Sequence, residues 1–242
     1  MDGLLTYLLM IIICFGGSFV QRVSGFGFGI FVMLFFPYFM PSHAFAAATS
    51  SLLSCFTSIY NAIRQRKYLR IMLVLPMLIA SLITLPIAIK FSSSAPETVM
   101  KRLLGIVLIG LSIYFLYFSA RIHMKPNAKN SFLSGALSGT LSGLFSTGGP
   151  PAVIYLLHAT SDKLVYFATL QTFFAISNIY STTVRAINGI IDRNVLLHVA
   201  VGLIGCCLGN WIGGQTFDKL DGQKLKRIIY IGMIVSGVLM ML

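Results

Sequence analysis

Long apolar stretches alternate with short polar segments along the whole chain. A helix that crosses a bilayer needs about 20 apolar residues, whereas a transmembrane β-strand needs about 10 with alternating polarity. The stretches in this chain have helical length and do not alternate. Six of them are expected to span a membrane, at residues 44–63, 70–90, 101–120, 164–187, 194–214 and 226–242. The chain is therefore predicted to be an all-α polytopic membrane protein.

Two further apolar segments, 4–40 and 131–159, are interrupted by glycine and proline. The interruptions are the sequences SGFGFG at 24–29 and STGGPP at 146–151. As an unbroken helix, residues 131–159 would be about 43 Å long, which exceeds a hydrocarbon core of about 30 Å. Each segment is therefore predicted to be a broken helix, which either crosses the membrane once or enters and leaves on the same side.

The two halves of the chain repeat each other in sequence. Corresponding pairs are AT at 48–49 and 168–169, SIYN at 58–61 and NIYS at 178–181, Arg64 and Arg185, and KRLL at 101–104 and KRII at 226–229. Each half also opens with one of the two breaks. Matches in the same order along both halves predict a duplication. The expected units are a first transmembrane repeat at 1–120, a basic linker at 121–130 and a second repeat at 131–242.

Basic residues distinguish the two topologies, because Lys and Arg gather on the cytoplasmic side of a membrane. If the broken helices enter and leave on the same side, twelve basic residues lie on the cytoplasmic side and five on the outer side. If each broken helix crosses the membrane once, the counts are nine and eight. The five outer residues would be Lys90, Lys101, Arg102, Arg185 and Arg193. The larger bias favours inverted repeats with both termini outside. Each repeat would hold one broken element and three transmembrane helices, about eight helical elements in total.

Charge narrows the function. The net charge is +12, but the basic residues lie mostly in short loops between apolar runs, so nucleic-acid binding is not expected. The six acidic residues all lie in loops or at a terminus, whereas cation pathways and proton relays usually have a carboxylate within a span. The four cysteines lie in apolar runs without metal-ligand spacing. The sequence therefore predicts an anionic substrate and neither a metal nor another cofactor.

The two breaks are the candidate binding site. Unpaired backbone groups cost several kcal/mol in hydrocarbon, so broken helices at membrane depth are buried in protein or line a cavity. Transporters commonly hold their substrates at such breaks. Pro150 and Pro151 suit the first turn of a half-helix, and the N-terminus of a helix attracts anions. Ser146 and Thr147 supply hydroxyl groups beside that N-terminus.

Other polar residues could complete this site. Gln171 and Asn178 are seven residues apart and share a helix face. Tyr60 and Tyr180 are repeat partners, and Arg22 beside the first break either faces the cavity or snorkels to an interface. The candidate substrate-binding residues are Arg22, Ser24, Gly25, Gly27, Tyr60, Ser146, Thr147, Gly148, Gly149, Pro150, Gln171, Asn178 and Tyr180.

Two alternatives to a transporter stay open. A passive anion channel would use the same site without alternating access, and the sequence does not separate the two. A small integral membrane enzyme is less favoured, because the sequence contains no metal-binding cluster, carboxylate pair or set of nucleophile, base and orienting group. The expected partners are a small anion and the lipid bilayer, and a homodimer is one possible assembly.

The breaks carry a resemblance to a known family. A glycine-rich break opens each half, and the second reads Gly-Gly-Pro-Pro before an apolar half-helix, which resembles the TauE/SafE family of sulfite and organosulfonate exporters. The resemblance covers nearly the whole chain and implies about eight helices in two related halves. It implies export of sulfite, sulfoacetate or related anions across the bacterial cytoplasmic membrane. The first break departs from the pattern, with phenylalanines where small residues and a proline would be expected.

Overall fold

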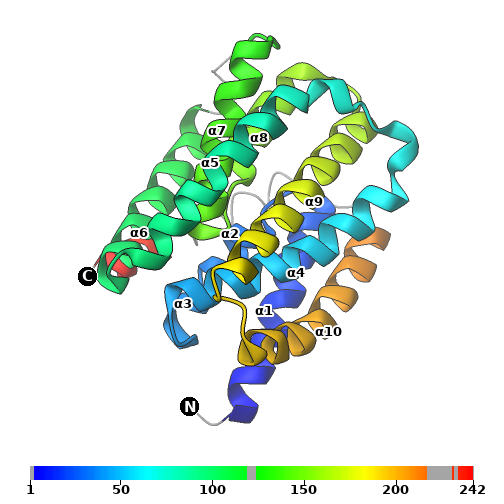
Figure 1. Ribbon diagram of the computed structural model, residues 1–242. Coiled ribbons are helices and arrows are strands. Elements are labelled where there is room, and N and C mark those ends of the chain that lie inside the picture. The colour runs from blue at the N-terminus through cyan, green and yellow to red at the C-terminus, as the bar shows by residue number, and fades with distance from the viewer. Residues whose placement is uncertain (1–2, 119–123, 217–230, 232–233, 242) are drawn as a thin grey trace.

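The computed structural model describes residues 3–118, 124–216, 231 and 234–241, which form helices and connecting segments without any strand (Figure 1). The first half contains α1 (Gly3–Ser24), α2 (Phe28–Met33), α3 (Phe36–Phe39), α4 (His43–Arg64), α5 (Leu75–Ser94) and α6 (Glu97–Ile113), which continues as a π-helix over Tyr114–Phe118. The second half contains α7 (Ala128–Phe145), α8 (Gly149–Ala159), α9 (Lys163–Ile187) and α10 (Arg193–Thr216). The prediction of an all-α protein is confirmed for the described residues.

The helices follow the expected segments with two differences. The span expected at 70–90 becomes helical only at Leu75, after 3₁₀ turns at Arg66–Tyr68 and Ile71–Leu73. The first broken segment contains two short helices after its break instead of one, because Pro37 has no N–H with which to continue α2. The last expected span, 226–242, lies largely outside the described residues.

Four described helical segments are long and apolar enough to cross a membrane by length and composition. These segments are Leu4–Ser24, Leu75–Ser94, Glu97–Tyr117 and Arg193–Thr216. They agree with the prediction of a polytopic membrane protein. The remaining helices are α2, α3, α7 and α8 of the broken elements and the central helices α4 and α9 (Figure 1).

The helices α4 and α9 have 22 and 25 residues but are not among the apolar spans. The reason is a polar face on each helix, with residues recurring every three to seven positions. These residues are Ser51, Ser54, Ser58 and Asn61 on α4, and Gln171, Asn178, Ser181 and Arg185 on α9. Because α4 packs against α9, the two faces meet, and Asn178 Nδ2 donates to Ser54 Oγ at 3.0 Å. We call these eight residues the polar seam.

The outer helices pack in two matching pairs, α1 along α10 and α5 along α7. Glycines recur at intervals of four residues in α7 and α10, and small residues let helices approach each other closely. Gly139 of α7 lies against the backbone of Ser81 in α5, and Gly209 of α10 lies against that of Phe15 in α1. The absence of a side chain lets each pair of backbones approach closely.

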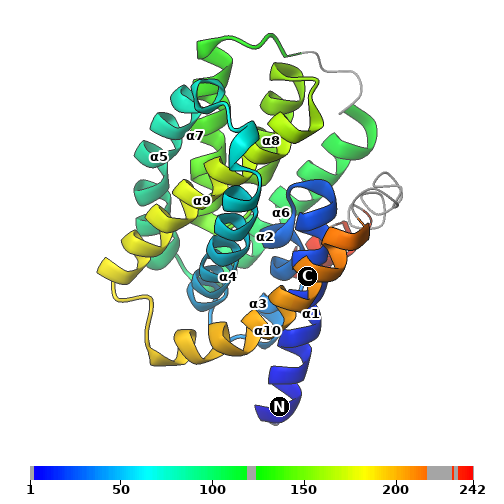
Figure 2. The same cartoon turned by 90° about the vertical axis from the view of Figure 1, so that its right-hand side faces the viewer.

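The two broken elements reach the middle of the molecule from opposite ends. In Figures 1 and 2, α1 rises from the N-terminal end and α3 returns towards it, whereas α7 descends from the far end and α8 returns there. The breaks meet between them, where the backbone of Gly29 lies against the carbonyl of Ser146. The breaks of both halves therefore form a single region.

Candidate functional site

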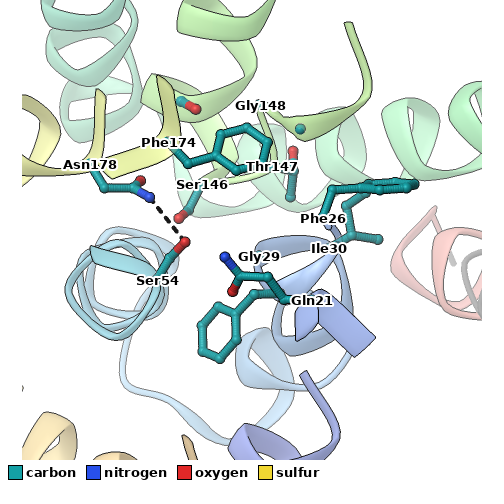
Figure 3. A pocket seen from close by; sticks show the side chains of 14 residues that line it. Gln21, Phe26, Gly29, Ile30, Ser54, Ser146, Thr147, Gly148, Phe174 and Asn178 are labelled. Atoms are coloured by element: carbon teal, nitrogen blue, oxygen red, sulfur yellow. Dashed lines mark hydrogen bonds between the residues drawn. The ribbon is translucent and has the colours of Figure 1, made fainter. Parts of the chain in front are cut away.

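A small cavity lies where the two breaks meet (Figure 3). The cavity has a volume of about 30 Å³, which is room for very few waters. Its lining comes from α1, α4, α7, α9 and both breaks: Gln21, Phe26, Gly27, Phe28, Gly29, Ile30, Ser54, Ser142, Ser146, Thr147, Gly148, Gly149, Phe174 and Asn178. We call it the break cavity.

The second break brings a helix N-terminus to this cavity. α8 starts at Gly149 with Gly148 as its N-cap residue, and no side chain caps it. The N-terminus of a helix carries partial positive charge. Pro150 and Pro151 have no N–H, so the backbone donors at this end of α8 are the N–H groups of Gly148 and Gly149. Gly148 has no room for a side chain, because an added Cβ would meet the carbonyl of Ser138. Gly148 and Gly149 both line the cavity, and neither has a side chain to cover its backbone.

Two hydroxyl groups flank that N-terminus. Ser146 has a left-handed backbone conformation with φ 58°, and its Oγ lies 3.1 Å from Ser51 Oγ. Thr147 is 1 % exposed, and its Oγ1 atom has no hydrogen-bond partner among the described residues. Figure 3 shows both side chains beside Gly148. A buried hydroxyl without a partner is costly, so Thr147 offers an unused donor at the cavity wall.

The first break contributes differently. The Oγ of Ser24 bonds to the carbonyls of Val20 and Phe26 within its own turn. Gly25 and Gly27 have φ values of 85° and 102°, which glycine adopts readily. Phe26 lines the cavity with its ring, and α2 is only six residues long. The first break therefore supplies backbone and aromatic surface to the cavity.

Gln21 in α1 connects the cavity to both central helices. Its Nε2 donates to Ser58 Oγ at 3.0 Å and to Gln171 Oε1 at 3.1 Å, while Thr57 Oγ1 donates to its Oε1 at 2.8 Å. Gln171 Nε2 in turn donates to the carbonyl of Gly25 at 2.6 Å. The sequence analysis missed Gln21, although it stands one residue before Arg22 in an apolar run.

Several expected site residues do not line the cavity. Arg22 is 5 % exposed, donates to Asn61 Oδ1 at 3.0 Å and lies 5.4 Å over the ring of Phe167. It is thus buried and does not snorkel. Tyr60 is half exposed and accepts a hydrogen bond from Arg64. The others outside the lining are Ser24, Gly25, Pro150, Gln171 and Tyr180.

The topology prediction counted Arg185 among the five basic residues of the outer loops. The structure instead places Arg185 within α9. Its side chain is fully buried. Its Nη2 donates to the carbonyl of Gly143 at 2.8 Å and to that of Ser142 at 3.3 Å. A signal was present in the sequence, because Gln171, Asn178 and Arg185 follow one another at seven-residue intervals on one helix face.

The described residues contain no cluster of three His, Cys, Asp or Glu side chains that could hold a metal ion. What converges on the break cavity is a helix N-terminus, hydroxyl groups and amides. Such groups bind anions by hydrogen bonding.

Comparison with known proteins identifies the family of the chain. The family model described as "Sulfite exporter TauE/SafE" matches residues 9–240. The chain belongs to this family. It is therefore a membrane transporter of the sulfite/organosulfonate exporter family and not an enzyme, as the sequence predicted.

One curated relative is the "Probable sulfite/organosulfonate exporter TauE" of Cupriavidus necator. It is 23 % identical over 235 residues, covering 93 % of this chain and 90 % of the relative. No solved structure matches the chain.

Proposed function

We propose that this protein exports sulfite, sulfoacetate or a related organosulfonate across the bacterial cytoplasmic membrane and binds it in the break cavity. The observation that carries the proposal is the convergence of the α8 N-terminus and the unpartnered Thr147 hydroxyl on one buried cavity. A sulfonate or sulfite head group presents several acceptor oxygens, which suit N–H and O–H donors. The choice of sulfur compound rests on the family and on the relative's name.

We further propose that residues 1–120 and 131–242 are inverted repeats. If α1 corresponds to α7, α4 to α9 and α5 to α10, a two-fold axis exchanges the pair α1–α10 with the pair α7–α5. The same axis passes between α4 and α9, which pack on each other. The approach of the broken elements from opposite ends supports this arrangement (Figure 2). Inverted repeats with broken helices are a common basis for alternating access.

The exporter family favours a carrier over a passive channel. The break cavity has a volume of about 30 Å³, so the surrounding helices must move before an organosulfonate can enter it. A carrier of this kind closes around its substrate and opens to one side at a time. Transport by the purified protein should therefore saturate with substrate and be accelerated by substrate on the opposite side, whereas flux through a channel would show no such acceleration.

Proteoliposomes loaded with labelled sulfite or sulfoacetate provide the test, with and without a pH gradient. Thr147→Val keeps the shape of the side chain and removes the hydroxyl. A hydrogen bond to a charged partner contributes about 1.5–3 kcal/mol, so affinity should fall roughly tenfold to a hundredfold. Thr140→Val is the matched control, because the Thr140 hydroxyl bonds to Ala136 in its own helix and does not line the cavity.

The proposal fails if Thr147→Val transports and binds like the parent protein. It also fails if the purified protein moves sodium or potassium and no anion. In the first case the anion site lies elsewhere, and in the second the assignment of an anionic substrate is wrong.

A further inference from the structure

Two helix ends of opposite polarity meet at the second break. α8 directs its positive N-terminus to the break cavity, but α7 ends at Phe145, immediately before the same break. The last carbonyls of a helix have no partner within it and carry partial negative charge. Left uncovered, they would repel the anion that the α8 N-terminus attracts. An anion site at this break therefore needs a means of cancelling the end of α7.

Side chains from three other helices cover these carbonyls. Arg185 of α9 donates to the carbonyls of Ser142 and Gly143. The Ser142 carbonyl also accepts from the backbone N–H of Ser146 at 2.9 Å, so Arg185 covers the Gly143 carbonyl and is a second donor to Ser142. His43 Nε2 of α4 donates to the carbonyl of Leu144 at 2.8 Å, and Ser92 Oγ of α5 donates to the same carbonyl at 3.2 Å. Of these three side chains, Arg185 is the one that carries a full positive charge.

The guanidinium of Arg185 is not neutralised by a neighbouring acid. Among the described residues the single ion pair joins Lys101 to Glu97 at 3.9 Å, so no described carboxylate pairs with Arg185. Its Nη1 atom is buried and has no hydrogen-bond partner in that part of the chain. A buried cation without a counter-charge is expensive, and such residues in membrane proteins often serve a substrate path. A bound anion nearby would offset this cost.

Ser142 connects this cation to the break cavity. Its carbonyl accepts from Arg185, and the same residue lines the cavity wall. The guanidinium of Arg185 is therefore separated from the break cavity by Ser142 alone. It is buried in the protein, where solvent screens charges only weakly.

We propose that Arg185 determines the charge selectivity of the break cavity by covering the negative end of α7 and adding a buried positive charge behind the site. This inference rests on the anion site proposed above. Arg185 acts through the field at the cavity and not by touching the substrate, so it is a positioning residue. Its effect on binding must grow with the charge of the anion.

Sulfate and methanesulfonate are suitable probes, because both present a tetrahedral sulfur head group but differ in charge. Removing a nearby buried charge should lower the affinity for monovalent methanesulfonate about tenfold and for divalent sulfate on the order of a hundredfold. Arg185→Gln should thus lower the ratio of sulfate to methanesulfonate affinity about tenfold, as measured by calorimetry on purified protein. Arg185→Lys keeps the charge and should keep the ratio close to that of the parent.

Two further variants make the test independent of folding defects. Ser181→Asp adds a carboxylate beside Arg185, whose Nε lies 3.4 Å from Ser181 Oγ; it neutralises the guanidinium without removing it and should lower the ratio as Arg185→Gln does. Arg64 is the repeat counterpart of Arg185 and is exposed. Arg64→Gln should therefore leave the affinity ratio unchanged.

An unchanged ratio in both Arg185→Gln and Ser181→Asp overturns the inference. If Thr147→Val still weakens both probes in that case, the proposed anion site stands and only the role of Arg185 falls. An equal loss for both probes in Arg185→Gln also contradicts the inference, because a purely structural defect does not distinguish ligand charge.

Discussion

The backbone of Gly29 lies directly against the carbonyl oxygen of Ser146, so the break after α1 touches the break after α7. Neither contact atom belongs to a flexible side chain, and a Cβ at position 29 would overlap the carbonyl. This contact joins the two halves at the wall of the break cavity. The geometry of one break therefore depends on the other.

Gly29→Ala should destabilise the protein, because overpacking of a close contact costs about 1–3 kcal/mol. The melting temperature in detergent measures this effect. Gly110→Ala in α6 is the matched control, since an added Cβ there meets nothing within 4 Å and alanine favours a helix over glycine by about 1 kcal/mol. Equal melting temperatures for the two variants would show that the two breaks do not touch as described.

The neighbouring glycines of the second break should respond differently to substitution. At Gly148 an added Cβ would meet the carbonyl of Ser138, whereas at Gly149 it would lie 3.6 Å from the nearest atoms, which is ordinary contact. Gly148→Ala should therefore lower the melting temperature and anion affinity together. Gly149→Ala should fold normally, and the larger Gly149→Leu should fold but lose binding because it fills the cavity. Normal sulfite binding by Gly149→Leu would contradict this account.

The sequence predicted the helices because run length and breaks are local properties. The glycines at 24–29 and the glycines and prolines at 146–151 interrupt the helices, and both breaks lie where expected. The runs 44–63 and 164–187 were predicted as helices from their length, and α4 and α9 cover them. The polar seam keeps both helices out of the set of apolar spans.

The contacts of Arg185 and Gln21 could not be predicted from the sequence, although the seven-residue spacing from Gln171 and Asn178 places Arg185 on the polar face of α9. The positive-inside rule counts a basic residue near the end of a span as a loop residue. Arg185 is instead buried by carbonyls of α7, more than 40 residues earlier in the chain, and no periodic pattern reports that contact. Gln21 acquires its role from Thr57, Ser58 and Gln171, which come together only in the folded bundle.

Cysteine accessibility tests the inverted arrangement. In a variant without the native cysteines, Lys67→Cys and Lys125→Cys should label from the cytoplasmic side, because both lie in loops that the basic-residue bias assigns there. Lys90→Cys near the end of α5 should label from outside. All three side chains are exposed, so lack of reagent access would not explain a negative result. These positions lie on the same sides in both topologies, so the deciding residue is Lys163, which follows the second broken element and is exposed. Lys163→Cys should label from the cytoplasmic side, as Lys67→Cys does. Labelling of Lys67→Cys and Lys163→Cys from opposite sides would reject inverted repeats. Lys224, also expected inside, lies outside the described residues.

Gln21 permits a direct test of the charge preference of the break cavity. Gln21→Glu and Gln21→Leu both remove the donors to Ser58 and Gln171, but only glutamate can add a negative charge to the cavity wall. The difference between the two variants therefore isolates charge from hydrogen bonding. Like charges at close range in a partly buried site repel by several kcal/mol, so ionised Gln21→Glu should bind sulfite at least tenfold more weakly than Gln21→Leu. Gln215→Glu, on an exposed position of α10, should bind as the parent does. If Gln21→Glu and Gln21→Leu bind sulfite equally well above neutral pH, the anion does not occupy the cavity that Gln21 lines.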